Sequence, residues 1–261
     1  MDDNRGSNGG STSRSPEPSL REWRLAVRRA LPLSTGMLSP SEADARLADF
    51  EEATRGQFSR EVRQRLEAEL GARYSPALAS FTTYQVYAGA RQQAALDQVL
   101  GVLEGLPAFV GMGRNLVLYG SVGTGKDHLL AALLYAAAEL AFDVKWVNVQ
   151  RLMGQSRDRI KAEAPEETLI RQLGQPRVLG LSDPLPAVGD LTAWNVGLLY
   201  RLLDERNRSM CGTWVTLNVS NPRTALEEIQ SALSVPVWSR LREDAELVPC
   251  FWPDYRGRTR P

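Results

Sequence analysis

The stretch that decides the fold is Gly120-Ser121-Val122-Gly123-Thr124-Gly125-Lys126-Asp127. It fits the pattern G-x-x-x-x-G-K of phosphate-binding loops and departs only at Asp127, where Ser or Thr is usual. Glycines let backbone N–H groups turn inward around phosphate oxygens, and a following helix adds the positive end of its dipole. An apolar run precedes the motif and a long apolar segment follows it. Because a chance glycine-rich turn would lack this context, the sequence predicts a nucleotide site here.

The residues that end the motif suggest how ATP and Mg²⁺ would be held. Lys126 is expected to reach the β- and γ-phosphates of ATP. The Asp127 carboxylate is an acceptable Mg²⁺ ligand, but without the metal its charge would weaken ATP binding. It is an equally open alternative that Asp127 only complements the helix dipole. His128, the only histidine, belongs to the predicted nucleotide-binding residues by position, and we favour a structural role for its ring over that of a catalytic base.

Composition limits the classes of function. The 261 residues suffice for one domain with a smaller appendage, and 31 Lys and Arg residues balance 31 Asp and Glu residues. Any contact with DNA therefore needs a local basic patch. Cys211 and Cys250 lie in apolar stretches without a neighbouring Cys or His, so neither a zinc site nor a disulfide framework is indicated. The polar start of the chain lacks a signal-peptide pattern, and the apolar segment Leu129–Phe142 is too short to span a bilayer. We expect a cytoplasmic protein without a membrane partner.

The first 80 residues differ in composition from the rest. Residues 1–19 are rich in Gly, Ser, Asn and Pro, which predicts a disordered tail. Residues 20–80 are expected to form an N-terminal helical region that contacts a partner or DNA. Within it, residues 20–31 place apolar side chains at helical spacing among arginines, which is typical of a short basic amphipathic helix. A merely solvated basic face remains an alternative.

A second helix has clear start and stop signals. Ser39 can cap it, Pro40 suits the first helical position, and Glu42 can complete a capping box. The helix is expected to run to about Leu70, where a glycine follows. The segment Phe81–Leu103 then predicts a further, mostly helical stretch.

Strand-like and helical patterns alternate in the remainder of the chain. Helical patterns include Asp127–Ala141 and Thr192–Arg206. The five strand-like runs are Asn115–Tyr119, Val144–Val149, Arg177–Leu181, Thr213–Leu217 and Leu247–Phe251. Such alternation is typical of an α/β fold, in which helices cover both faces of a parallel sheet. We therefore predict a five-stranded parallel sheet in an ATP-binding domain of residues 81–261, with ATP at the carboxyl ends of the strands.

At this point the chain resembles a known family. Residues 115–129 resemble the block N-L-x-L-x-G-x-x-G-T-G-K-[TN]-H-L of DnaC/IstB-like AAA+ proteins. Residues 238–242, Trp-Ser-Arg-Leu-Arg, resemble the S/D-R-L segment of that family, and residues 251–256 resemble its last strand and W-x-x-Y-R ending. The resemblance covers about residues 80–256. It implies a P-loop NTPase core of the AAA+ kind that binds ATP at a subunit junction and works on DNA.

The resemblance also implies roles for particular residues. Lys126 matches the P-loop lysine, and Asp183 falls in the Walker B region. Asn218 resembles the sensor that orients the attacking water. Arg240 resembles the arginine finger that one subunit offers to the next. Arg242 competes for that role, and a purely structural salt bridge of Arg240 to a nearby acidic residue is the plain alternative.

The Walker B segment departs from the family pattern. Four apolar residues are normally followed by two acids, but here Ser182-Asp183-Pro184 follows the run. In one alignment Ser182 takes the place of the metal acid and Asp183 that of the water-activating acid, with Asp127 compensating at the metal. In the other, Asp183 is the metal acid and Pro184 replaces the base. Either way a carboxylate is missing, which predicts a weak ATPase and leaves open that hydrolysis is absent.

The function implied by the resemblance is an ATP-dependent helicase loader of the DnaC type. The alternatives are an IstB-like transposition helper, or an ATP-switched interaction module with little hydrolysis. The expected partners are ATP, Mg²⁺, single-stranded DNA, a replicative helicase or transposase, and further copies of the chain in an ATP-dependent homo-oligomer. Trp252 and Tyr255 could stack on bases, but their place at the end of a core strand favours packing.

Overall fold

The structure, a computed structural model, describes residues 40–161, 166–186 and 189–257. The chain divides into two compact units, Met1–Asp49 and Phe50–Pro261. The predicted tail and the predicted basic helix at residues 20–31 lie outside the described residues.

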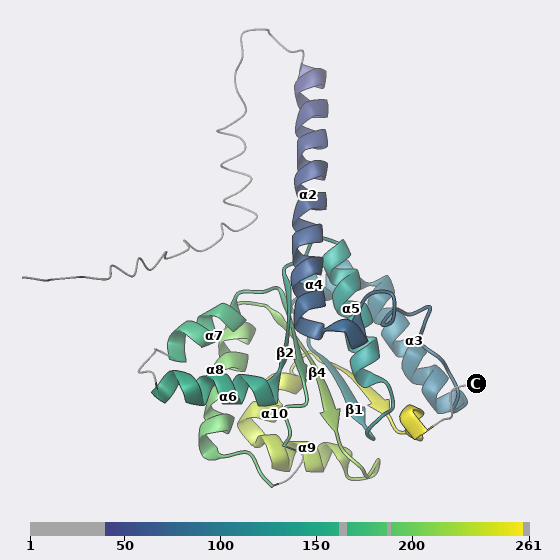
Figure 1. Cartoon of the computed structure of the whole chain (residues 1–261), viewed down its shortest axis with the longest axis vertical. Helices are drawn as coiled ribbons and strands as arrows, with labels where there is room; N and C mark the ends of the chain where they lie inside the picture. The colour runs from purple at the N-terminus through teal and green to yellow at the C-terminus, as the bar shows by residue number, and fades with distance from the viewer. Residues whose placement is uncertain (1–39, 162–165, 187–188, 258–261) are drawn as a thin grey trace, which may run out of the picture. The chain divides into compact units, whose positions relative to one another are not determined.

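The sheet of the larger unit has five strands that all run parallel (Figure 1). Their order across the sheet is β2-β3-β4-β1-β5, so β2 and β5 are its edges. The strands are β1 (Leu116–Gly120), β2 (Val144–Asn148), β3 (Val178–Ser182), β4 (Gly212–Asn218) and β5 (Glu246–Cys250). The five strand-like runs of the sequence are each found, shifted by a residue or so, and the predicted α/β fold is confirmed.

Helices cover both faces of this sheet (Figure 1). One hydrophobic cluster is built from the second half of α2 (Pro40–Leu70) together with α3 (Ala90–Glu104), α4 (Leu106–Gly111) and α5 (Lys126–Glu139). The cluster on the other face is built from α6 (Val149–Lys161), α7 (Glu166–Gly174), α8 (Ala193–Arg208), α9 (Ala225–Leu233) and α10 (Val235–Arg242). Two short 3₁₀ helices, η1 (Ala72–Tyr74) and η2 (Tyr255–Gly257), complete the described elements.

Side chains of the central strands alternate between the two clusters. Leu116 and Leu118 of β1 belong to the α5 side, whereas Val117 between them belongs to the α8 side. In β4, Trp214 and Val215 divide in the same way. Because both faces are buried, these strands read as nearly continuous apolar runs, as is usual for parallel sheets.

Two helical predictions have different outcomes. The helix expected to start at Ser39 is α2, which begins at Pro40, ends at Leu70 and is followed by Gly71 at a φ of 76°. The segment Phe81–Leu103, predicted as mostly helical, is helical from Ala90 onward, and its first nine residues are not. There the buried Gln92 side chain accepts hydrogen bonds from two backbone N–H groups, of Tyr87 and Ala88, which holds the chain in a non-helical path.

Helix α2 also completes the free edge of the sheet. Trp146 N of β2 donates to Glu69 Oε2 at 2.8 Å, and Arg65 Nη2 donates to Val144 O at 2.9 Å. Leu66, which is fully buried, packs in the same cluster as the sheet. These contacts satisfy main-chain groups that an edge strand would otherwise leave unpaired. The domain boundary at residue 80 stays a prediction, although α2 shares this core.

Candidate nucleotide-binding site

The loop between β1 and α5 depends on glycines at positive φ. Gly120, Gly123 and Gly125 have φ values of 145°, 77° and 88°. A Cβ on Gly120 would lie only 2.1 Å from the carbonyl oxygen of Cys250, because the end of β5 packs closely there and receives a 3.0 Å hydrogen bond from Ser121 N. The loop therefore lies at the carboxyl ends of the strands, with a backbone path that side chains at these positions would obstruct.

Lys126 begins α5 and is almost fully buried, with 5% of its surface exposed. Its Nζ donates to Gly120 O at 3.0 Å and to Ser121 O at 2.6 Å. Burial lowers the pKa of this ammonium, while the nearby negative charges of Asp127 and Asp183 counteract the shift. A buried cation whose close partners are neutral carbonyls gains strongly from an anion at the same loop.

Asp127 is attached to the sheet by a hydrogen bond. Thr216 Oγ1 of β4 donates to Asp127 Oδ1 at 2.7 Å. Thr216 is buried and lies in register with Ser182, the last residue of β3. Registered residues of neighbouring parallel strands project on the same face, so the Thr216 side chain, which contacts Asp127, lies beside that of Ser182. The sequence did not single out Thr216, and its only signal was a hydroxyl within an apolar strand.

Asp183 follows β3 directly and has a φ of 50°, a conformation that Asp adopts more readily than most residues. Its Oδ1 accepts a 2.6 Å hydrogen bond from Asn218 Nδ2 at the end of β4. Burial raises the pKa of Asp183, and the charge of Asp127 raises it further. This contact is compatible with both alignments of the Walker B segment, so the roles of Ser182 and Asp183 stay predictions.

The donor set fits ATP with Mg²⁺. The glycine loop and Lys126 offer N–H groups and a cation to phosphates, and the oxygens of Asp127, Asp183 and Ser182 are the hard ligands that Mg²⁺ prefers. Over the residues that the structure describes, no group of three or more His, Cys, Asp or Glu side chains could hold a metal alone. Magnesium usually binds through one or two carboxylates plus substrate phosphates, which is the arrangement that two carboxylates beside a phosphate loop provide.

His128 connects α5 to the segment before α3. Its Nε2 donates to Ser80 O at 2.8 Å, and its ring meets the edge of Tyr84 with centroids 5.3 Å apart. Tyr84 in turn donates from its hydroxyl to Thr124 O at 3.3 Å. Burial lowers the pKa of His128, so the ring is neutral near pH 7. These contacts support a structural role for His128, next to the loop but not directed at phosphate chemistry.

The chain after β5 braces the loop and contains residues that sequence reasoning missed. Trp252 is buried and its Nε1 donates to Thr124 O at 3.0 Å, which is a packing role. A Cβ on Gly123 would lie 1.8 Å from Asp254 Oδ1, and Arg256 Nε is 3.4 Å from that same oxygen. Arg256 thus lies beside the carboxylate that packs against Gly123, which brings another cation near the loop.

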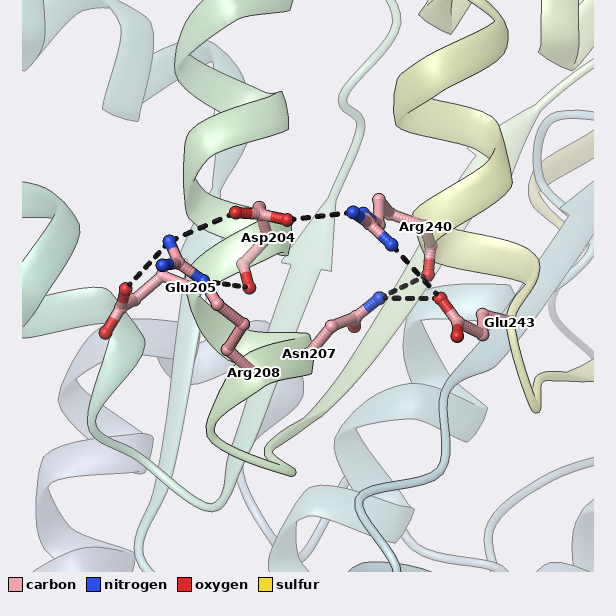
Figure 2. Close-up of polar contacts among 6 residues, drawn as sticks. All are labelled: Asp204, Glu205, Asn207, Arg208, Arg240 and Glu243. Carbon is pink, nitrogen blue, oxygen red and sulfur yellow. Dashed lines mark hydrogen bonds and ion pairs between the residues drawn. The ribbon is translucent and has the colours of Figure 1, made fainter.

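Arg240 lies elsewhere, on α10 (Figure 2). Its guanidinium pairs with Asp204 of α8 at 3.1 Å and with Glu243 at 3.6 Å. Its backbone oxygen accepts from Asn115 Nδ2, and Asn115 directly precedes β1. Arg240 is therefore near the start of β1, whereas the phosphate loop follows the end of β1. The length of the strand, about 15 Å from the rise per residue, separates the two. The structure does not bring Arg240 to the loop of its own chain.

Comparison with known proteins places this site in a family. The sequence pattern of the IstB-like ATP binding proteins matches residues 46–248 of the chain. The chain belongs to the IstB-like ATP-binding protein family. A relative from Mycobacterium tuberculosis is 31% identical over 263 residues, which cover 94% of this chain and 96% of the relative. That relative is named for ATP binding and for its place in an insertion sequence.

Solved structures confirm the fold of this IstB-like protein. The crystal structure of the DnaC helicase loader superposes with a TM-score of 0.60 at 23% identity, and the match covers 69% of this chain and 99% of that one. AMPPCP-bound DnaA from Aquifex aeolicus superposes with a TM-score of 0.51 at 18% identity, over 69% of this chain and 51% of that one. At these identities the likeness concerns the fold. Among the described helices, none has the length and apolar character needed to cross a membrane.

Proposed function

We propose that this IstB-like protein is an ATP-dependent helper of DNA transposition. The observation that carries the proposal is the insertion-sequence relative, which matches 94% of the chain. The helicase-loader interpretation rests on a likeness to DnaC that is 23% identical and concerns the fold. Transposition helper, which the sequence offered as an alternative, is therefore the better supported function.

Different residues of the site bind different parts of the complex of ATP with Mg²⁺. The glycine loop and Lys126 bind the phosphates, and Lys126 exchanges carbonyl partners for phosphate oxygens. Mg²⁺, bound through the Asp127 carboxylate, would offset the negative charge of the polyphosphate. Asn218 keeps the Asp183 carboxylate oriented towards a water that could attack the γ-phosphate. We expect slow turnover because one carboxylate of the usual acidic pair is absent.

The position of Arg240 supports assembly of several copies around ATP. Since this side chain is remote from its own loop, it can act only on ATP that another subunit holds. ATP would then join two subunits, and the resulting oligomer would present its combined surfaces to DNA and to a transposase. In this mechanism ATP controls assembly first and is hydrolysed second.

The decisive experiment pairs the protein with the transposase of the same insertion element. Mixtures with target DNA and ATP, ADP or no nucleotide would be separated by size-exclusion chromatography with light scattering. We expect a complex of helper, DNA and transposase that forms with ATP, and strand transfer stimulated by the helper. Binding to a replicative helicase with no effect on the transposase would instead support the loader function.

A second candidate is an ATP-switched interaction module with little hydrolysis, which Ser182 at the metal-acid position favours. Turnover of ATP, measured with and without single-stranded DNA at concentrations that allow assembly, separates the two. ATP-dependent assembly without turnover would favour the module, whereas turnover stimulated by DNA would favour the ATPase.

A further inference from the structure

A carboxylate and a hydroxyl occupy unusual positions at the nucleotide site. In P-loop ATPases, Mg²⁺ is held by the Ser or Thr hydroxyl after the loop lysine and by an aspartate on a nearby strand. Here the residue after Lys126 is Asp127, and the last residue of β3 is Ser182. The chain thus keeps one hydroxyl and one carboxylate, with their positions reversed.

The structure brings the two positions together. Asp127 Oδ1 accepts the hydroxyl hydrogen of Thr216 at 2.7 Å, and Thr216 lies in register with Ser182 on the adjacent strand. Thr216 and Ser182 are 1% and 2% exposed, so both hydroxyls are enclosed where α5 packs on the sheet. The Asp127 carboxylate therefore bonds to the β4 residue that lies beside Ser182, the position where the strand aspartate would otherwise stand.

We propose that Asp127 and Ser182 have exchanged tasks, so that Asp127 supplies the metal-binding carboxylate from α5 and Ser182 supplies a supporting hydroxyl from β3. The proposal rests on the proposed ATP binding and adds how the metal is held. Its consequence is steep metal dependence. The carboxylate now stands next to the phosphate loop, where it repels ATP alone and favours ATP with a divalent cation.

The plainer alternative is that Asp127 only stabilises the start of α5 through the helix dipole. One observation argues against it. The Asp127 carboxylate accepts a hydrogen bond from Thr216 of β4. An acid that served the dipole alone would need no partner in the sheet.

The test compares the parent with Asp127→Ser, Ser182→Asp and the reciprocal double variant, which restores the usual arrangement with the same composition. Calorimetry would give the dissociation constant of ATP with Mg²⁺ and with EDTA, and the ratio of the two measures metal coupling. Paramagnetic resonance of Mn²⁺ added with ATP would report the metal's ligands directly. Asp127→Asn, which is isosteric and still accepts from Thr216, removes the charge with little risk to folding.

We expect the coupling ratio to fall at least about tenfold in Asp127→Ser and in Asp127→Asn. Mutation of a residue that only supports a metal ligand typically costs that much metal affinity. Both variants should bind ATP more tightly than the parent in EDTA. The double variant should recover coupling to near the parent's value and restore the Mn²⁺ spectrum of a carboxylate ligand. Parental coupling in Asp127→Asn, or no recovery in the double variant, would overturn the exchange.

Asp254→Asn is the matched control, because Asp254 also carries a charge against the loop, at Gly123. If Asp127 were only a nearby charge, Asp127→Asn and Asp254→Asn would each change ATP affinity by the same factor with Mg²⁺ and with EDTA. The coupling ratio would then equal that of the parent. We expect this behaviour for Asp254→Asn alone. A parent that binds no ATP even with Mg²⁺ would refute the proposed function, whereas a parent that binds ATP without metal coupling would refute only the exchange.

Discussion

Arg240 Nη2 of α10 lies 3.1 Å from Asp204 Oδ1 of α8, and this ion pair is partly open to solvent (Figure 2). The two side chains are 39% and 24% exposed. Exposed pairs of this kind contribute little to stability. An approaching phosphate could therefore displace Asp204 at small cost, so the pair is compatible with a guanidinium that is held ready for another subunit.

The first prediction concerns Arg240→Ala. We expect isolated subunits to bind ATP as the parent does, because Arg240 is remote from its own loop. ATP-dependent assembly should be lost, and any turnover should fall by roughly 10³-fold or more, the contribution of an arginine finger. Light scattering and ATP turnover at matched concentrations measure the two effects. An Arg240→Ala protein that assembles and turns over normally would remove the finger assignment.

Arg242→Ala supplies the control for this experiment. Arg242 is exposed, and no ion pair joins it to another residue in the described part of the chain. We expect the Arg242 variant to behave like the parent, and loss of assembly in this variant alone would transfer the role to Arg242.

Mixing Arg240→Ala with Lys126→Ala chains should restore some activity, because a junction can then combine an intact loop with an intact finger.

The second prediction is that Lys126→Ala weakens ATP binding by about 2–3 kcal/mol, or roughly 30- to 150-fold. The reason is the loss of a charge-assisted contact to the phosphates. Lys145→Ala is the matched control, because Lys145 lies on β2 and pairs with Glu69 rather than with the loop. Calorimetry with ATP measures the affinities, and circular dichroism checks the fold. Equal ATP affinities for the two variants would contradict the assignment.

Much of the fold was predictable from local patterns. The central strands β1, β3 and β4 are buried on both faces and therefore read as apolar runs. Glycines with Lys126 marked the loop between β1 and α5. The start of α2 was predictable because Pro40 suits only the first turn of a helix. Residues 81–89 are not helical, because the Gln92 side chain accepts hydrogen bonds from the backbone N–H groups of Tyr87 and Ala88. Apolar periodicity does not reveal such a contact between a side chain and the backbone.

The missing part of the site consists of contacts between remote segments. Thr216 meets Asp127 across 89 residues of sequence, and Asp254 is brought against Gly123 by the chain after β5. Nothing in local periodicity specifies such pairs, since they depend on strand order and register. The pairing of Arg240 with Asp204 depends likewise on how α10 packs against α8.

The third prediction tests the close approach at Gly120. Gly120→Ala should be strongly destabilising, by more than about 1–3 kcal/mol, because its Cβ would meet Cys250 O at 2.1 Å and its φ of 145° is strained for alanine. Gly101→Ala is the control, since Gly101 is within α3 and a Cβ there meets nothing within 4 Å. That change should stabilise by about 0.5–1 kcal/mol. Urea unfolding measures both, and similar effects for the two glycines would contradict the structure.

The fourth prediction concerns the α2 contact with the sheet edge. Glu69→Leu should lower the free energy of unfolding by about 1–3 kcal/mol, because it leaves Trp146 N–H without its acceptor. Glu69→Gln keeps an oxygen at that place and should cost much less. Urea unfolding of the two variants and the parent at neutral pH gives the comparison. Equal losses would mean that the charge of Glu69, and not its hydrogen bond, matters at this edge.

A comparison of the parent with Glu69→Gln also tests how stability depends on pH. Burial raises the pKa of Glu69 above its ordinary 4.5, although the Trp146 N–H bond and the charge of Lys145 oppose the shift. The folded protein therefore binds this proton more tightly than the unfolded chain, so the ionised carboxylate opposes folding at neutral pH. That opposition should fade as the pH falls through the raised pKa and vanish below 4.5. Since glutamine has no such proton, the stability of the parent relative to Glu69→Gln should rise between pH 7 and 4.5. A difference that stays constant over this range would show that burial does not hinder ionisation of Glu69.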